Sequence, residues 1–103
     1  MIRKAFRMSV HHGQEDEYAR RHNPIWQELA DTLVAHGVQN YSIFLDRQTG
    51  DLFAYAEIDS EAQWQAIAAT DVCRRWWQYM SDVMPSQPDG EPVSRPLAEV
   101  FHL

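Results

Sequence analysis

The chain has 103 residues, 45% of them hydrophobic, and a formal net charge of −6. This length predicts a single domain over residues 1–103 with a modest core, and the acidic balance argues against nucleic acid, whose recognition needs a basic patch. No apolar run approaches the roughly 18 residues of a membrane span, and no apolar segment follows the first charges as in a signal peptide. We therefore expect a cytoplasmic protein without a membrane partner.

The first third of the chain predicts a strand followed by an interrupted helix. Residues 2–10 alternate apolar and polar side chains, which is typical of a strand. Lys4 interrupts the apolar face, so it either reaches past the end of the strand or lies in a polar pocket. Residues 14–36 have helical periodicity, but Pro24 cannot continue a helix. We expect the helix to restart there, with Asn23 as its N-cap.

The middle of the chain predicts two strands joined by a turn. Residues 38–46 place Tyr41, Ile43 and Leu45 on one face. Residues 52–58 are apolar on both faces, whereas an antiparallel strand usually leaves one face to water. This pattern indicates that helices cover one face of the sheet and that something else covers the other.

The last part predicts a second helix, a long loop and a closing strand. Ser60 with Gln63 fits a helix-capping pair, and Thr70 predicts a break and a restart. The segment 85–96 holds four of the five prolines and reads as an extended loop. Residues 97–103 are expected to form the final strand.

The order strand, helix, strand, strand, helix, strand predicts an α+β, ferredoxin-like βαββαβ fold with helices on one face of a four-stranded sheet. A second copy stacked on the open face would explain the doubly apolar third strand. We therefore expect a two-fold homodimer whose sheets form a dimeric α+β barrel.

A candidate pocket lies between the predicted sheet and helices. Tyr18 and His22 are four residues apart, so they share the face of the first helix that also carries the buried stripe. Tyr41 would join them from the second strand, and Trp76 or Trp77 from the second helix. A histidine can both give and take a proton near neutrality, and tyrosine hydroxyls bind polyols. The set favours proton transfer on a neutral, hydroxyl-rich molecule.

Less specific interpretations of these residues remain open. His22 could be an ordinary core histidine, because only some perturbed buried groups are functional. Trp76 and Trp77 point about 100° apart on a helix, so one could pack in the core and the other at an interface.

Other chemistries are disfavoured. The lone Cys73 excludes an internal disulfide and a multi-cysteine metal site, and its place on an apolar helical row favours the core. The adjacent His11 and His12 diverge and lack the further ligands of a metal site. Four scattered glycines provide no phosphate-binding loop. We expect neither a metal nor a cofactor.

Five segments carry a family resemblance: M-I-R-K-A-F, Y-A-R-R-H-N-P-I-W, N-Y-S-I-F-L-D, T-D-V-C-R-R-W-W-Q-Y-M-S-D-V-M-P and E-V-F. Through them the chain resembles the L-rhamnose mutarotase family along its whole length. It departs from the family pattern at His11-His12, at 47–49 and at His102.

The resemblance implies an isomerase acting on carbohydrates. It would be a ferredoxin-like dimer that interconverts the α and β anomers of L-rhamnose without cofactor or metal. The resemblance further implies that His22 is the proton donor and that the sugar is held by Tyr18, Tyr41, Trp76 and Trp77.

Two other functions suit the same fold. One is a cofactor-free monooxygenase of the dimeric-barrel type, an analogy of fold alone. The other is a sugar-binding or sensor module without catalysis. Within the mutarotase interpretation, the base could be a tyrosine, a carboxylate or water. The range of sugars depends on the shape of the pocket.

Overall fold

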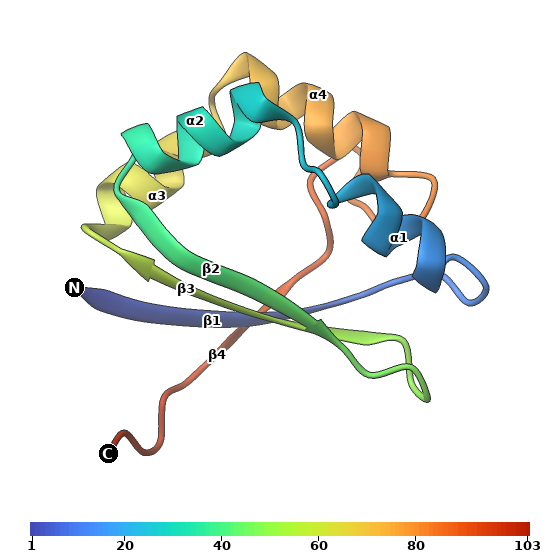
Figure 1. Ribbon diagram of the computed structural model, residues 1–103, viewed down its shortest axis with the longest axis horizontal. Helices are drawn as coiled ribbons and strands as arrows, with labels where there is room; N and C mark the ends of the chain where they lie inside the picture. The colour runs from blue at the N-terminus through green and yellow to red at the C-terminus, as the bar shows by residue number, and fades with distance from the viewer.

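The computed structural model describes residues 1–103 (Figure 1). Its four strands form one antiparallel sheet in the order β2-β3-β1-β4. The strands are β1 (Ile2–Ser9), β2 (Val38–Leu45), β3 (Asp51–Ile58) and β4 (Arg95–Leu97). This topology confirms the ferredoxin-like α+β fold.

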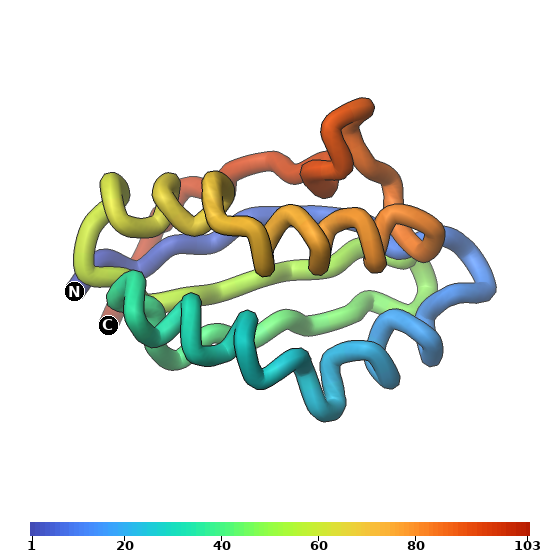
Figure 2. Tube along the Cα trace, turned by 90° about the horizontal axis from the view of Figure 1, so that it is seen from above, coloured from blue at the N-terminus to red at the C-terminus, as the bar shows by residue number.

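Both predicted helices are divided in two, and all four segments cover the same face of the sheet (Figure 1). They are α1 (Glu15–Arg21), α2 (Gln27–Ala35), α3 (Glu61–Ile67) and α4 (Asp71–Met80). Seen from above, α1 and α2 form one row and α3 and α4 the other (Figure 2). None of these helices has both the length and the apolar character that crossing a bilayer requires.

The break in the first helix lies where the sequence predicts it, but its cap is different. Asn23 is not an N-cap, because its side-chain amide donates backwards to the Ala19 carbonyl at 2.7 Å. The Asn23-Pro24 peptide is cis, and α2 begins only at Gln27, after a non-helical Trp26. Proline disfavours the helical conformation in the residue before it, so the chain needs a short connector before the helix resumes.

The two caps predicted in the second helix are confirmed. Ser60 Oγ accepts from the Gln63 amide at 3.1 Å, and Thr70 Oγ1 accepts from the Cys73 amide at 3.4 Å. Each hydroxyl satisfies an amide that a helix start leaves without a partner. The sequence therefore locates both starts correctly.

The closing strand is shorter and earlier than predicted. β4 comprises only Arg95–Leu97 and pairs with Ala5–Arg7 of β1. Pro96 is tolerated because β4 is an edge strand, where the backbone N–H that proline lacks can face solvent and need not pair with another strand. Beyond Leu97 the chain leaves the sheet (Figure 1), and Val100 is 95% exposed. The prediction of a strand over 97–103 was therefore wrong.

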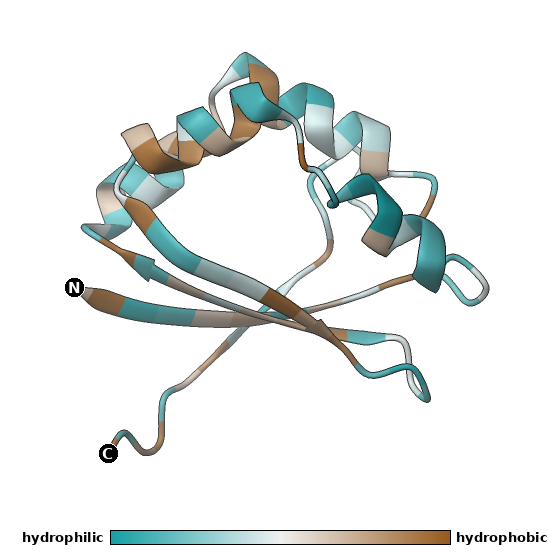
Figure 3. Ribbon diagram, in the orientation of Figure 1, coloured by the Kyte–Doolittle hydropathy of each residue, from teal (hydrophilic) through white to brown (hydrophobic).

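The two faces of the sheet differ in burial. On the helix side, β3 carries four side chains that are essentially inaccessible: Leu52, Ala54, Ala56 and Ile58. On the open side, Phe44 and Phe53 are paired across β2 and β3 and are 65% and 39% exposed. Figure 3 shows both hydrophobic and hydrophilic segments along β1 and β2, so neither strand is apolar throughout.

Candidate active site

A cavity of about 930 Å³ lies between the sheet and the helices. All five side chains singled out in the sequence line it: Tyr18, His22, Tyr41, Trp76 and Trp77. Tyr18 and His22 come from α1 and its C-cap, Tyr41 from β2, and the two tryptophans from α4. Residues far apart in the sequence therefore converge on one cavity. The structure thus brings the whole predicted set together.

His22 is the C-cap of α1, and its ring is held in a defined orientation. Its Nδ1 lies 2.8 Å from the Tyr18 carbonyl oxygen. A carbonyl only accepts, so Nδ1 carries the hydrogen and Nε2 remains for a ligand. The centre of the His22 ring lies 4.5 Å from the centre of the Tyr18 ring. It lies 5.2 Å from the centre of the Trp76 ring, which it meets edge to face.

Burial sets the charge of this histidine. Removal from water lowers the pKa of His22, and the hydrogen bond to the Tyr18 carbonyl offsets only part of that effect. The ring is therefore mostly neutral at pH 7, with a lone pair on Nε2.

The two tyrosines keep their hydroxyl protons. Burial raises the pKa of both Tyr18 and Tyr41 far above the neutral range. Both hydroxyls are thus able to donate to, and accept from, a ligand. The centre of the Tyr41 ring lies 6.4 Å from that of Phe6 and 5.9 Å from that of Trp64.

A β-bulge places Tyr41 in the cavity. Between Gln39 and Ser42, β2 advances three residues while β3 advances only two. The extra residue moves Tyr41 onto the helix side, where Val38 also lies, although a regular strand would put the two on opposite faces. Asn40 makes this possible with φ of 52°, and its amide donates to Glu57 at 2.8 Å. Only the tolerance of asparagine for this conformation hints at the bulge in the sequence.

The two tryptophans have different surroundings. Trp76 is buried, with Trp26 edge-on at 5.1 Å and His22 on another side. Trp77 is partly buried, and the Arg74 guanidinium lies 5.8 Å from its ring centre. Each presents part of its ring to the cavity.

The sequence analysis does not place Trp64 or Glu61 in the candidate pocket, yet both line the cavity from α3. Lys4 also lines it, in agreement with the polar-pocket alternative, and pairs with Glu61 at 3.1 Å.

Cys73 lines the same cavity but offers no nucleophile, and His36 lies outside the cavity. Cys73 is buried, and burial raises the pKa of its thiol to about 11, which keeps it protonated and unreactive. His36 caps α2 and does not line the cavity. No group of three or more His, Cys, Asp and Glu side chains is arranged to hold a metal ion.

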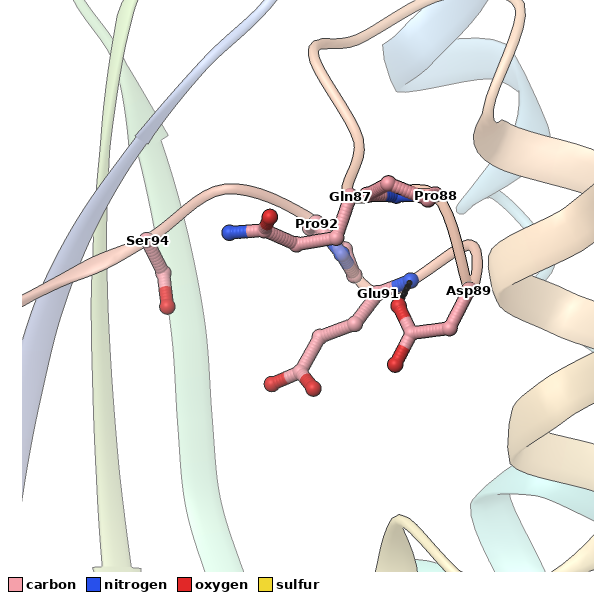
Figure 4. A pocket seen from close by; sticks show the side chains of 6 residues that line it. All are labelled: Gln87, Pro88, Asp89, Glu91, Pro92 and Ser94. Atoms are coloured by element: carbon pink, nitrogen blue, oxygen red, sulfur yellow. Dashed lines mark hydrogen bonds between the residues drawn. The ribbon is translucent and has the colours of Figure 1, made fainter.

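A second, shallower hollow of about 520 Å³ lies in the proline-rich loop (Figure 4). Six residues line it, none of them cationic, aromatic or a histidine: Gln87, Pro88, Asp89, Glu91, Pro92 and Ser94. It therefore lacks both the imidazole and the aromatic rings that line the larger cavity. The larger cavity is therefore the candidate active site.

Comparisons with known proteins give matches over almost the whole length of the chain. A family model described as L-rhamnose mutarotase matches residues 3–103. An L-rhamnose mutarotase from Opitutus terrae is 66% identical over 103 residues, covering 100% of this chain and 99% of the relative. The crystal structure of L-rhamnose mutarotase from Formosa agariphila matches with a TM-score of 0.92 and 39% identity, over 100% of this chain and 99% of that one.

A more distant structural likeness concerns the fold alone. A putative antibiotic biosynthesis monooxygenase from Nitrosomonas europaea matches with a TM-score of 0.66 but only 11% identity, over 98% of this chain and 100% of that chain. Shared architecture at this level carries no information about chemistry.

Proposed function

The chain belongs to the L-rhamnose mutarotase family, and on that premise we propose how its cavity interconverts the α and β anomers of L-rhamnose. The reaction opens the pyranose ring to an aldehyde, rotates the bond between C1 and C2, and closes the ring on the other face. Opening removes a proton from the anomeric hydroxyl and delivers one to the ring oxygen. Both oxygens are attached to C1, so one well-placed group reaches both.

We assign the proton transfer to His22. The neutral ring takes the anomeric proton on Nε2, the C1–O5 bond breaks as the C1=O1 bond forms, and the imidazolium gives the proton to O5. Closure reverses these steps. The observation that carries this assignment is the Tyr18 carbonyl on Nδ1, because it fixes the tautomer in which Nε2 is the basic nitrogen. In this proposal His22 is both the base toward the anomeric hydroxyl and the proton donor to the ring oxygen.

The tyrosines and tryptophans hold the sugar in this proposal. The hydroxyls of Tyr18 and Tyr41 remain protonated and bind sugar hydroxyls. Trp76 and Trp77 offer flat faces to the C–H side of the ring. General acid–base help of this kind contributes roughly 10²–10⁴-fold to a rate, and fixed positioning adds to it.

The test is proton NMR saturation transfer between the two anomeric protons of L-rhamnose. Uncatalysed exchange is too slow to carry saturation from one signal to the other. We expect transfer with the wild-type protein and a loss of roughly 10²–10⁴-fold in the exchange rate with His22→Ala.

The chain supplies a matched control for this experiment. His36 also caps a helix and its Nδ1 also bonds to a carbonyl four residues earlier, Thr32 O at 2.7 Å, but it does not line the cavity. His36→Ala should exchange the anomers as the wild type does. A folded His22→Ala protein with full activity would refute the assignment.

We further propose that two copies associate through the open face of the sheet, in the cytoplasm. Phe44 and Phe53 form an exposed apolar pair there, and Val100 and Phe101 extend beyond the sheet on the exposed tail. Soluble proteins seldom leave such apolar surface uncovered, and a two-fold pair of sheets would cover it.

A further inference from the structure

One end of the cavity contains an ion pair that the proton transfer does not use. Lys4 Nζ lies 3.1 and 3.2 Å from the two carboxylate oxygens of Glu61, and 5.8 Å from the centre of the Trp64 ring. All three residues line the cavity. They belong to β1 and α3, whereas His22 is the C-cap of α1. The helices α3 and α1 lie toward opposite ends of the sheet (Figure 1).

The position of Lys4 calls for an explanation beyond solubility. Its neighbours on the cavity face of β1 are Phe6 and Met8, and its partner across the ladder is the fully buried Ala56. The lysine side chain is only 25% exposed. A charge in such surroundings has a desolvation cost that its partner offsets only in part, so an apolar residue would stabilise this face at least as well.

The pair retains unused hydrogen-bonding capacity. An ammonium group has three N–H donors, and a carboxylate has about four acceptor positions. The Lys4–Glu61 contact uses some of these, and Glu61 remains 47% exposed. A donor and an acceptor side by side, next to the flat face of Trp64, fit adjacent hydroxyls on a sugar ring.

The cavity connects this end to the histidine. Trp64 lies 5.9 Å from the Tyr41 ring, and Tyr41 is one of the residues assigned to the sugar. At about 930 Å³ the space is at the upper end of the range for drug-sized ligands, so a monosaccharide held only near His22 would be free to turn. Reaction requires one fixed orientation of C1 and O5.

We propose that Lys4 and Glu61 bind the hydroxyls on C3 and C4 of the pyranose, opposite the anomeric carbon, and thereby determine which sugars are accepted. The inference rests on the mutarotase function, since that function places C1 and O5 at His22. Neither residue is the base, because the base must reach the oxygen attached to C1.

The test separates binding from chemistry with methyl α-L-rhamnopyranoside, which cannot open its ring. Its Kd is measured by titration calorimetry, and anomer exchange of L-rhamnose by saturation transfer. Loss of a hydrogen bond to a charged group should raise the Kd of Lys4→Met by roughly 10- to 100-fold. The exchange rate at saturating sugar should change much less, and Lys4→Arg should recover part of the affinity.

Arg75 supplies a matched control. It also joins two elements through a glutamate, Glu28 at 2.9 Å, and its guanidinium also lies 5.8 Å from a tryptophan ring, that of Trp26. Neither Arg75 nor Glu28 lines the cavity. Arg75→Met should therefore leave both the Kd and the exchange rate unchanged.

A second measurement keeps the inference testable if Lys4→Met folds poorly. The 3-deoxy and 4-deoxy analogues of the methyl glycoside should bind the wild type more weakly than the parent glycoside does. In Glu61→Gln this difference in Kd should be smaller, because the substitution and the missing hydroxyl remove the same interaction. Equal Kd values for parent and analogues, or a folded Lys4→Met protein with wild-type Kd, would show that the pair only ties β1 to α3. Exchange of rhamnose by that protein would leave the mutarotase function intact.

Discussion

At the scale of single residues, His22 combines two constraints that act in opposite directions on its proton. Burial lowers the pKa of the ring, while the Tyr18 carbonyl favours the protonated form without overcoming that burial. A neutral imidazole whose Nε2 carries the lone pair acts first as a base, and only then as an acid. The reaction rate should therefore depend on pH through the protonation of His22.

We predict that kcat/KM is constant around pH 7 and falls as the pH decreases through the lowered pKa of His22. The sign follows because protonation removes the lone pair from Nε2, so the anomeric proton has no acceptor. Saturation transfer measured between about pH 5 and 8 reports this pKa for the free enzyme.

A rate that instead rose steadily with acidity, after subtraction of the uncatalysed exchange, would mean that the enzyme begins as an acid. Unfolding must be followed in parallel. The unfolded chain has an ordinary histidine pKa and binds more protons than the folded one, so stability also declines as the pH falls below about 6.5.

The sequence predicts these residues unequally well. The four-residue spacing of Tyr18 and His22 is sufficient to place both on the buried face of a helix. Lys4 is ambiguous, since its surroundings depend on which helix covers that end of β1. Tyr41 was assigned to the correct face, but the bulge at Asn40 that makes this possible is set by the pairing of two strands, which no local pattern reveals.

At the scale of elements, the short helix α1 is held by one arginine. Arg21 Nη1 donates to the Tyr79 carbonyl at 2.7 Å and to Asp82 at 2.8 Å, while its Nε donates to Glu17 at 2.7 Å. The guanidinium also lies 4.4 Å from the centre of the Tyr79 ring. These contacts join the end of α1 to the end of α4 and hold His22 against its neighbours.

We predict that Arg21→Met lowers the Tm by at least about 5 °C, since it removes several hydrogen bonds from a side chain that is only 10% exposed. It should also reduce the exchange rate, because α1 loses its attachment to α4. Differential scanning calorimetry and saturation transfer measure the two effects.

Arg20 is the natural control for this change. It contacts the same Glu17 from the adjacent position, through two hydrogen bonds of 2.8 and 2.6 Å, but its side chain is 66% exposed and does not contact Asp82. Arg20→Met should leave the Tm and the exchange rate close to those of the wild type. Equal effects of the two substitutions would mean that the attachment to α4 is unimportant.

The predictability of the elements follows the range of the forces behind them. Ser60 and Thr70 mark helix starts through bonds that span three residues, so the sequence reveals them. Asn23 satisfies the same pattern, but it bonds backwards to Ala19, and the break extends to Trp26. The length of β4 depends on which residues pair with β1, and only Arg95–Leu97 do so.

At the scale of the whole molecule, the open face of the sheet decides the expected assembly. Helices cover one face and leave the other bare (Figure 1). A charged residue at the centre of an apolar interface would be buried without a partner, which is strongly unfavourable.

We predict that Phe53→Glu converts a dimer into a monomer in light scattering coupled to size-exclusion chromatography. Val34→Glu is the matched control, because Val34 is an exposed apolar residue of α2 on the helix side. It should leave the mass unchanged. A wild-type protein that is monomeric at all concentrations would remove the basis for this assembly.

The alternation along β3 has a consequence for how the chain tolerates changes in length. Leu52 and Ala54 lie beneath the cavity, and the residues between and after them, Phe53 and Tyr55, lie on the open face. Insertion or deletion of one residue would exchange the two sets, whereas a change of two would restore them. The bulge at Asn40 shows that a single extra residue already reassigns a side chain in β2. In β3, therefore, a change of one residue in length alters both faces of the sheet unless a bulge absorbs it, whereas a change of two residues preserves them.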